Sequence, residues 1–135
     1  MSSTTTRDDK EYEMAHGQIT HVEFPADDTE RAQRFYSELC GWTFEGYEAL
    51  PGYFLFNTGS IESAGGAVGQ RGTATGDKLR IYITVDSIDD ALGKVERLGG
   101  KIVSPKSDIP GQGSYAVIND SEGSEVGLYE EPAAE

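Results

Sequence analysis

The stretch "ITHVEFPADDTERAQRFYSEL", residues 19–39, carries a strand pattern that runs directly into a helix pattern. Residues 19–24 alternate in polarity, so His21 and Glu23 share one face of a predicted strand, opposite Val22 and Phe24. A histidine and a glutamate side by side on a strand face are candidates for binding a ligand or a metal.

The helix that follows is predicted from its start signal and its spacing. Asp27, with Glu30 three residues later, resembles a capping box. Apolar residues then recur at helical spacing, at Ala32, Phe35, Tyr36 and Leu39. Because this stripe must pack on the apolar strand face, we expect His21 and Glu23 to point away from the helix.

The same pattern returns 59 residues downstream, where Asp86 corresponds to Asp27 and Leu98 to Leu39. Residues 79–85 alternate again, with Arg80 and Tyr82 on the polar face. Ser87 and Asp90 predict a second helix start, and the pair of glycines at 99–100 predicts its end. The chain therefore contains two copies of one unit.

Three further strands are predicted after each helix. They lie at 42–47, 53–58 and 64–69 in the first copy and at 101–104, 114–119 and 125–129 in the second. Each copy thus reads strand, helix, three strands, which gives an α+β fold of two βαβββ modules. If both sheets curl, their helix-free faces form a concave wall that carries His21 and Arg80.

Composition restricts the partners. The chain of 135 residues has a formal net charge of −13, which argues against nucleic acid and anionic membranes. A lone cysteine, Cys40, excludes an intramolecular disulfide and favours a reducing, cytoplasmic location. No apolar run approaches the roughly 18 residues of a membrane span. Residues 1–17 are expected to form a flexible acidic tail and residues 132–135 a short second tail.

Both modules resemble the vicinal-oxygen-chelate superfamily of glyoxalase I, bleomycin-resistance proteins and extradiol dioxygenases. The resemblance is carried by "THVEFPADDTERAQRFYSELCGW", "IYITVDSIDDALGKVERLGGKI" and "VINDSEGSEVGLYE". It implies one domain over about 18–131, with module one at 18–70 and module two at 78–131. It also implies curved sheets with the helices outside, and modules that pair within the chain or across a homodimer.

The resemblance further implies four positions for metal ligands, which fall on His21, about Gly66, Arg80 and Gly127. Of these only His21 matches, because arginine stays protonated and glycine has no side chain. A catalytic divalent metal generally needs about three protein ligands, so no metal or other cofactor is expected. A displaced site built from His21, Glu23 and Glu125 remains an alternative.

Aromatic residues gather on the segments next to the predicted cavity, and Phe54, Tyr82 and Tyr115 are candidates to contact a ligand. His21 is a hydrogen-bonding wall residue, a ligand contact or a base. Arg80 either pairs internally with Glu23 or anchors an anionic ligand.

Three functions stay open on the sequence. The first is a metal-free protein that binds a small aromatic or anionic molecule in its cavity. The second is a superfamily enzyme, a lyase, isomerase or dioxygenase, with an altered metal site. The third is a module that acts through its surface and has a vestigial cavity. The missing ligands at Gly66, Arg80 and Gly127 favour the first.

Overall fold

A computed structural model describes residues 15–133, so nearly all of the predicted tail at 1–17 and the last two residues of the chain lie outside the described part. The first module contains β1 (Ile19–Ala26), α1 (Thr29–Cys40), β2 (Thr43–Gly46), β3 (Tyr53–Asn57) and β4 (Gly65–Gln70). The second contains β5 (Arg80–Thr84), α2 (Ile88–Val95), β6 (Lys101–Ile109), β7 (Gly113–Asn119) and β8 (Glu125–Glu130). This order confirms the predicted α+β fold of two βαβββ modules.

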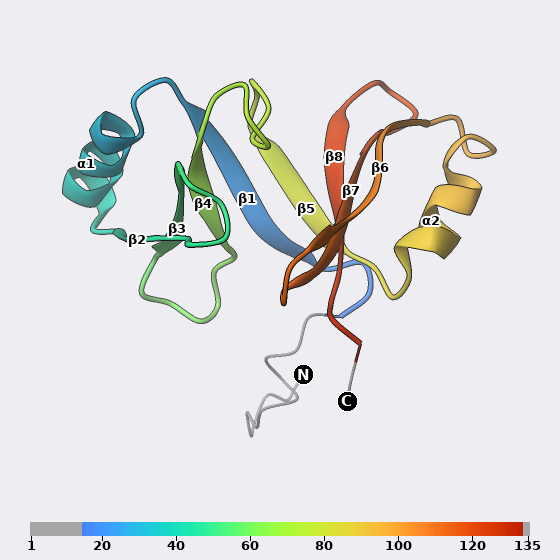
Figure 1. The fold of residues 1–135 in the computed structure, drawn as a ribbon, viewed down its shortest axis with the longest axis horizontal. Helices are drawn as coiled ribbons and strands as arrows, with labels where there is room; N and C mark the ends of the chain where they lie inside the picture. Colours follow the sequence, from blue (N-terminus) through green and yellow to red (C-terminus); the bar gives the residue numbers. More distant parts are fainter. Residues whose placement is uncertain (1–14, 134–135) are drawn as a thin grey trace.

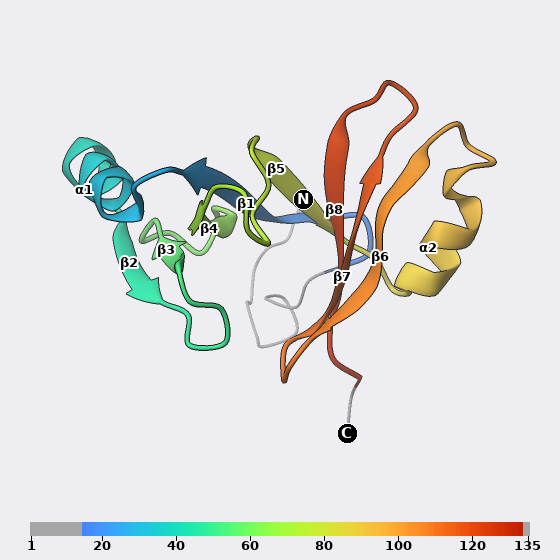
Figure 2. The ribbon, with the colours of Figure 1, turned by 45° about the horizontal axis from the view of Figure 1, so that its top comes forward.

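One mixed eight-stranded sheet, in the order β2-β3-β4-β1-β5-β8-β7-β6, joins the two modules. Figures 1 and 2 show α1 and α2 at opposite ends of the molecule, with β1 and β5 between them. These two strands run antiparallel, with His21 opposite Tyr82 and Glu23 opposite Arg80. The modules therefore pair within one chain, and the polar faces of their first strands form one surface.

The helix starts follow the sequence signals closely. Ser87 caps α2 as predicted, since its hydroxyl accepts a hydrogen bond from the backbone N–H of Asp90. The cap of α1 was predicted one residue too early. Asp28, not Asp27, accepts from the backbone N–H of Arg31, at 3.0 Å. Asp28 and Ser87 are also 59 residues apart, so the corrected cap fits the repeat better.

Each module has its own apolar core beneath its helix. In module two, Ile88 is fully buried at the start of α2 and lies in a cluster with Val85, Ala116 and Leu128. In module one the core is aromatic, and the rings of Trp42 and Phe56 stack with centroids 4.1 Å apart. The predicted stripe of α1 is only partly covered, because Phe35 and Leu39 remain 57% and 68% exposed.

The central strands bury their polar face and expose part of their apolar face. Glu23 and Arg80 are only 4% and 7% exposed, whereas Ile81 on the other face is 36% exposed. Buried charges are costly unless they are paired and hydrogen-bonded, so this surface needs internal partners. Within the part of the chain that the structure covers, no helix is long and apolar enough to span a membrane.

Replacement of Ile88 by alanine tests the core of module two. Ile88 has no exposed surface, so we expect Ile88→Ala to lower the free energy of unfolding by about 3 kcal/mol, measured by urea denaturation. Leu98→Ala is the matched control: this side chain is 64% exposed, and its loss should change stability by about 0.5 kcal/mol or less. Equal effects of the two substitutions would contradict the described core.

Candidate functional site

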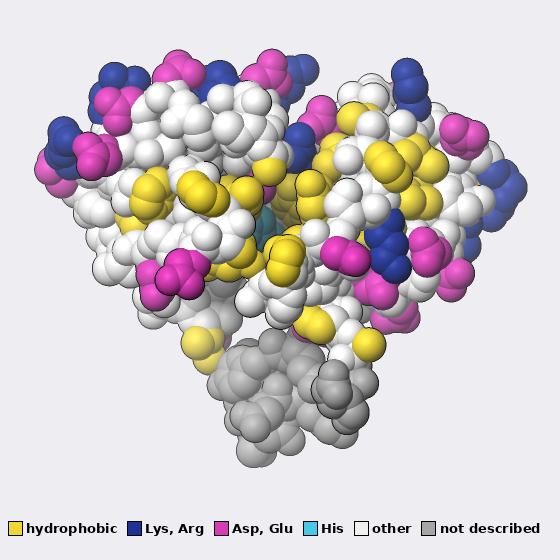
Figure 3. Space-filling model, viewed as in Figure 1, with side chains coloured by type: hydrophobic (Ala, Val, Ile, Leu, Met, Phe, Trp, Pro, Cys, Tyr) yellow, Lys and Arg dark blue, Asp and Glu magenta, His cyan; other side chains and the backbone are white. Residues whose placement is uncertain are grey.

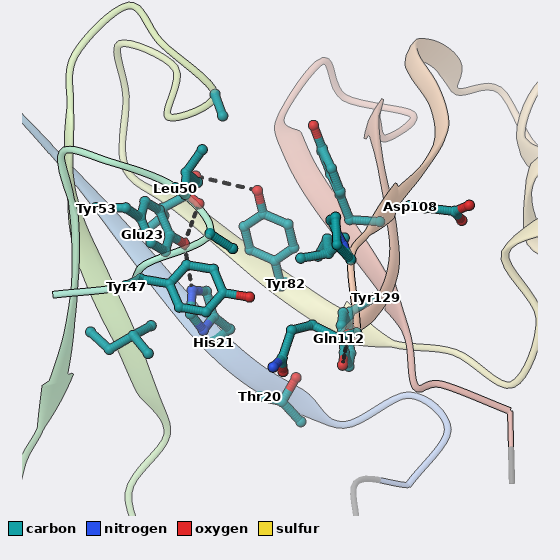
Figure 4. Close-up of a pocket in the computed structure, with 16 residues that line it drawn as sticks. Thr20, His21, Glu23, Tyr47, Leu50, Tyr53, Tyr82, Asp108, Gln112 and Tyr129 are labelled. Atoms are coloured by element: carbon teal, nitrogen blue, oxygen red, sulfur yellow. Dashed lines mark hydrogen bonds between the residues drawn. The ribbon is translucent and has the colours of Figure 1, made fainter. Parts of the chain in front are cut away.

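A cavity of about 380 Å³ opens on the concave side of the sheet, between the two modules. Figure 3 shows this hollow at the centre of the viewed face, bordered by hydrophobic side chains. Module one contributes one wall with Tyr47, Leu50, Tyr53 and Leu55, and module two contributes the other with Asp108, Ile109, Pro110, Gln112, Tyr115 and Tyr129. His21, Glu23 and Tyr82 lie between these walls on the central strands (Figure 4).

Tyrosine dominates the lining. Five of the seven tyrosines of the chain border the cavity, namely Tyr47, Tyr53, Tyr82, Tyr115 and Tyr129. A tyrosine offers an apolar ring face for packing and one hydroxyl for hydrogen bonding. An apolar cleft with a few fixed polar groups is the usual form of a small-molecule site.

Four of the six predicted ligand-binding residues line this cavity: His21, Glu23, Tyr82 and Tyr115. Arg80 lies on the same face but does not border the open space. Phe54 was placed wrongly, because alternation along β3 sends Tyr53 and Leu55 to the cavity and Phe54 to the helix side, where its ring lies close to Gly46. The parity of this short strand could not be read from the sequence.

The carboxylate of Glu23 is the centre of a hydrogen-bond network at the base of the cavity (Figure 4). Oε2 accepts from the hydroxyl of Tyr53 at 2.5 Å, and Oε1 accepts from the hydroxyl of Tyr82 at 3.2 Å. Burial raises the pKa of Glu23, while these hydrogen bonds and the Arg80 charge oppose the rise. The pKa values of Tyr53 and Tyr82 are also raised, chiefly by burial and then by the Glu23 charge.

Arg80 compensates Glu23 and a second carboxylate. Its Nη1 lies 3.3 Å from Oε1 of Glu23, and its Nε and Nη2 both donate to Oε2 of Glu125. Nη1 also contacts the hydroxyl of Tyr82 and the backbone oxygen of Ala74. Burial alone would lower the pKa of Arg80, but its hydrogen bonds and the Glu23 charge raise it above its ordinary value. The predicted internal pair with Glu23 is thus present, and every guanidinium nitrogen is engaged.

The connection between β4 and β5, residues 71–79, closes the cavity near Arg80. Ala74 in this connection borders the cavity and accepts from Arg80. Gly76 packs so closely on the guanidinium that a Cβ would meet Nη2 at 2.7 Å. The adjoining Thr75 is fully buried. This connection, for which the sequence predicted no role, covers the buried pair of Arg80 with Glu23.

His21 is held by Tyr53. Its Nε2 lies 2.8 Å from the Tyr53 hydroxyl oxygen, and the edge of its ring meets the ring of Tyr82 with centroids 5.5 Å apart. Desolvation by burial lowers the pKa of His21 to about 4. The imidazole is therefore neutral at physiological pH.

The residues at the base of the cavity do not fit a divalent metal. Arg80 is a cation bound to two carboxylates, and Gly127 lies beneath Tyr82, whose ring carbons occupy the place of a Cβ. At Gly66 a Cβ would point toward Phe56 on the helix side. Over residues 15–133, no group of three or more His, Cys, Asp or Glu side chains is arranged to hold a metal. In the alternative set, Glu23 and Glu125 are both bound to Arg80.

The lining also includes Thr20, Tyr53 and Tyr129, which were not among the predicted ligand-binding residues. Thr20 reaches the cavity face because the pairing of β1 with β5 shifts register between Ile19 and His21. Tyr129 follows Gly127 by two residues on β8 and shares its face, a relation that strand parity could have shown.

Comparison with known sequences finds a match to the family model described as bleomycin resistance protein-like N-terminal, over residues 18–59. A glyoxylase-like domain-containing protein of Didymella fabae is 29% identical over 125 residues, which cover 88% of this chain and 98% of that protein. A protein of Mycobacterium bovis named as a candidate glyoxylase is 26% identical over 126 residues. This chain matches 48% of that protein's length.

Solved structures share the fold at low sequence identity. A methylmalonyl-CoA epimerase aligns with a TM-score of 0.62 and 15% identity over 90% of this chain and all of that one. The Mn(II)-bound glyoxalase of Novosphingobium aromaticivorans aligns with a TM-score of 0.61 and 19% identity, over 89% of this chain and 42% of that one. A glyoxalase/bleomycin resistance protein/dioxygenase superfamily member from Vibrio splendidus has a TM-score of 0.62 at 8% identity, over 85% of this chain and 99% of that one.

Replacement of Arg80 tests how much its positive charge contributes to the stability of the protein. We expect Arg80→Met to lower the free energy of unfolding by about 3–5 kcal/mol, because Glu23 then lies buried without a counter-charge. Adding Glu23→Gln to this variant should restore part of the loss in a double-mutant cycle. The control is Arg71→Met, which removes an exposed pair with Asp27 and should cost about 1 kcal/mol or less. Similar losses from the two arginine substitutions would refute the role of Arg80.

Titration of His21 tests the burial of the imidazole. We expect an NMR titration to give a pKa near 4 rather than the ordinary 6.5. Between these two values the unfolded chain binds a proton at His21 that the folded chain does not. Stability should therefore fall as the pH drops from 6.5 to 4, by about 3 kcal/mol in full, and this component should vanish in His21→Gln. A midpoint near 6.5 would show that the imidazole is solvated.

Proposed function

The chain belongs to the glyoxalase/bleomycin resistance/dioxygenase superfamily, and we propose that it binds a small aromatic molecule in its cavity without a metal ion. The observation that carries the proposal is the cavity of about 380 Å³ with five tyrosines from both modules in its lining. Its volume is in the range of ordinary ligand pockets. An open cavity of this size also argues against the vestigial cavity of a purely surface-acting module.

The walls favour flat, apolar molecules. Tyr47 and Leu50 face Tyr129 across the open space (Figure 4). Leu55 and Tyr115 also line the cavity, and aromatic rings pack well against such surfaces. The polar groups at the base are already fixed by one another, since Glu23 accepts from Tyr53, Tyr82 and Arg80. A network whose hydrogen bonds are satisfied before a ligand arrives supplies a preorganised wall.

An enzymatic role for this site is supported less well. The glyoxylase names of the sequence relatives favour catalysis, and His21 is the natural base among the lining residues. With a pKa of about 4, however, its imidazole has little driving force to remove a proton at neutral pH. The same neutral, fixed imidazole is well suited to forming a hydrogen bond with a bound molecule.

A thermal-shift screen of small aromatic compounds, run in the presence of EDTA, tests the proposal. A compound that binds the folded chain alone stabilises it by about 2.7 kcal/mol at roughly one hundred times its Kd. We expect aromatic hits whose effect is unchanged by EDTA. Loss of every hit on chelation would show that a metal takes part.

Two neighbouring positions on β3 supply matched variants. Leu55→Trp adds a large side chain to the cavity wall, and we expect it to abolish the thermal shift of each hit. Phe54→Trp makes a similar change on the opposite face of the strand and should leave the shifts intact. Binding that survives Leu55→Trp would place the ligand elsewhere, and a screen without hits would argue against the proposed function.

A further inference from the structure

The hydrogen-bond chain at the base of the cavity determines which nitrogen of His21 carries its proton. Tyr53 has a single hydroxyl proton, and it is donated to Oε2 of Glu23 at 2.5 Å. The same hydroxyl oxygen lies 2.8 Å from Nε2 of His21, so Nε2 must be the donor in that contact. Because a neutral imidazole carries one N–H, Nδ1 is left with a lone pair.

This lone pair is open to a ligand. Nδ1 of His21 forms no hydrogen bond with the described residues. Nor is Nδ1 sealed inside the protein, since the one enclosed side-chain nitrogen or oxygen without a partner in residues 15–133 is Oγ1 of Thr75. His21 borders the cavity, so Nδ1 offers a hydrogen-bond acceptor there.

The charges around the cavity disfavour an anion. The lining contains the carboxylates of Glu23 and Asp108 but neither lysine nor arginine among its sixteen residues. Arg80 is behind this wall, with its three nitrogens bound to Glu23, Glu125, Tyr82 and Ala74. An anionic ligand would therefore lose its hydration without gaining a cation. Glu23 is paired with Arg80 and Asp108 accepts from the hydroxyl of Ser114, so both carboxylates of the lining already have a partner within the protein.

From this arrangement we infer that the ligand is a neutral aromatic molecule that donates one hydrogen bond, from an N–H or O–H group, to Nδ1 of His21. The inference rests on the function proposed above and adds the chemical class of the ligand. It also decides between the aromatic and anionic ligands that the sequence left open, in favour of an aromatic molecule without a carboxylate. The tyrosine rings would pack on its faces, while His21 selects for the donor.

Three probes of nearly the same shape test this inference by NMR titration at neutral pH. Indole has an N–H donor, N-methylindole lacks it, and an indole carboxylate adds a negative charge. We expect indole to bind roughly fivefold more tightly than N-methylindole, as one net hydrogen bond would give. The carboxylate should bind more weakly than either. When indole binds, the 15N chemical shift of His21 Nδ1 should change, because Nδ1 then accepts a hydrogen bond.

Two histidine variants separate the role of Nδ1 from general effects. His21→Phe keeps a ring at the wall, and we expect it to bind indole and N-methylindole equally. His16→Ala replaces the other histidine of the chain, an exposed residue bonded to the backbone of Asp86, and should keep the wild-type ratio. The ranking of the three probes is measured on the wild-type protein. It therefore remains a valid test even if His21→Phe does not fold.

The possible results distinguish the two proposals. Equal affinity of the wild-type protein for indole and N-methylindole, or tightest binding of the carboxylate, would overturn the inferred ligand class while leaving a small-molecule site in place. An unchanged Nδ1 signal on saturation with indole would overturn it as well. If none of the three probes binds and the thermal-shift screen also has no hits, the proposed function falls and the inference falls with it.

Discussion

The guanidinium of Arg80 is the interaction on which the rest of the site depends. It lies between Glu23 on β1 and Glu125 on β8, so it compensates one carboxylate from each module. Without this cation, burial of the polar face of the central strands would be costly, because two carboxylates would meet there without a counter-charge. The planar fork of arginine donates in several directions at once, which lysine cannot do in the same fixed geometry. Burial of Glu23 then fixes Tyr53, and Tyr53 fixes His21.

The fold followed from the sequence because its main signals are periodic. Strand alternation placed His21, Glu23, Arg80 and Tyr82 on one face correctly, and the repeat of 59 residues predicted the second module from the first. Periodicity does not show what covers a face, however. Phe35 and Leu39 have the spacing of core residues, yet α1 lies toward the end of the sheet and leaves both exposed. The spacing of apolar residues predicts a helix or strand and its apolar face. Whether the side chains on that face are buried depends on residues distant in the chain.

The chemistry of the site was less accessible to prediction. The pair of Glu23 and Arg80 could be proposed because both lie on cavity-facing positions of adjacent strands, but the second pair of Arg80, with Glu125, was not predicted. Tyr53 was missed because β3 has only five residues, too few to fix its parity. The lowered pKa of His21 arises from desolvation by residues of several strands. Such an effect depends on three-dimensional packing, for which the sequence around His21 carries no signal.

The contact between Gly127 and Tyr82 limits which side chains position 127 can accept. The Tyr82 ring fills the space in which any side chain at position 127 would begin. A single substitution that introduced a carboxylate at this position would therefore collide with the ring. Loss of Tyr82 alone would leave a void beside Glu23 and remove one of its hydrogen bonds. A carboxylate at position 127 would therefore need changes at both Gly127 and Tyr82, and each of these changes is unfavourable by itself.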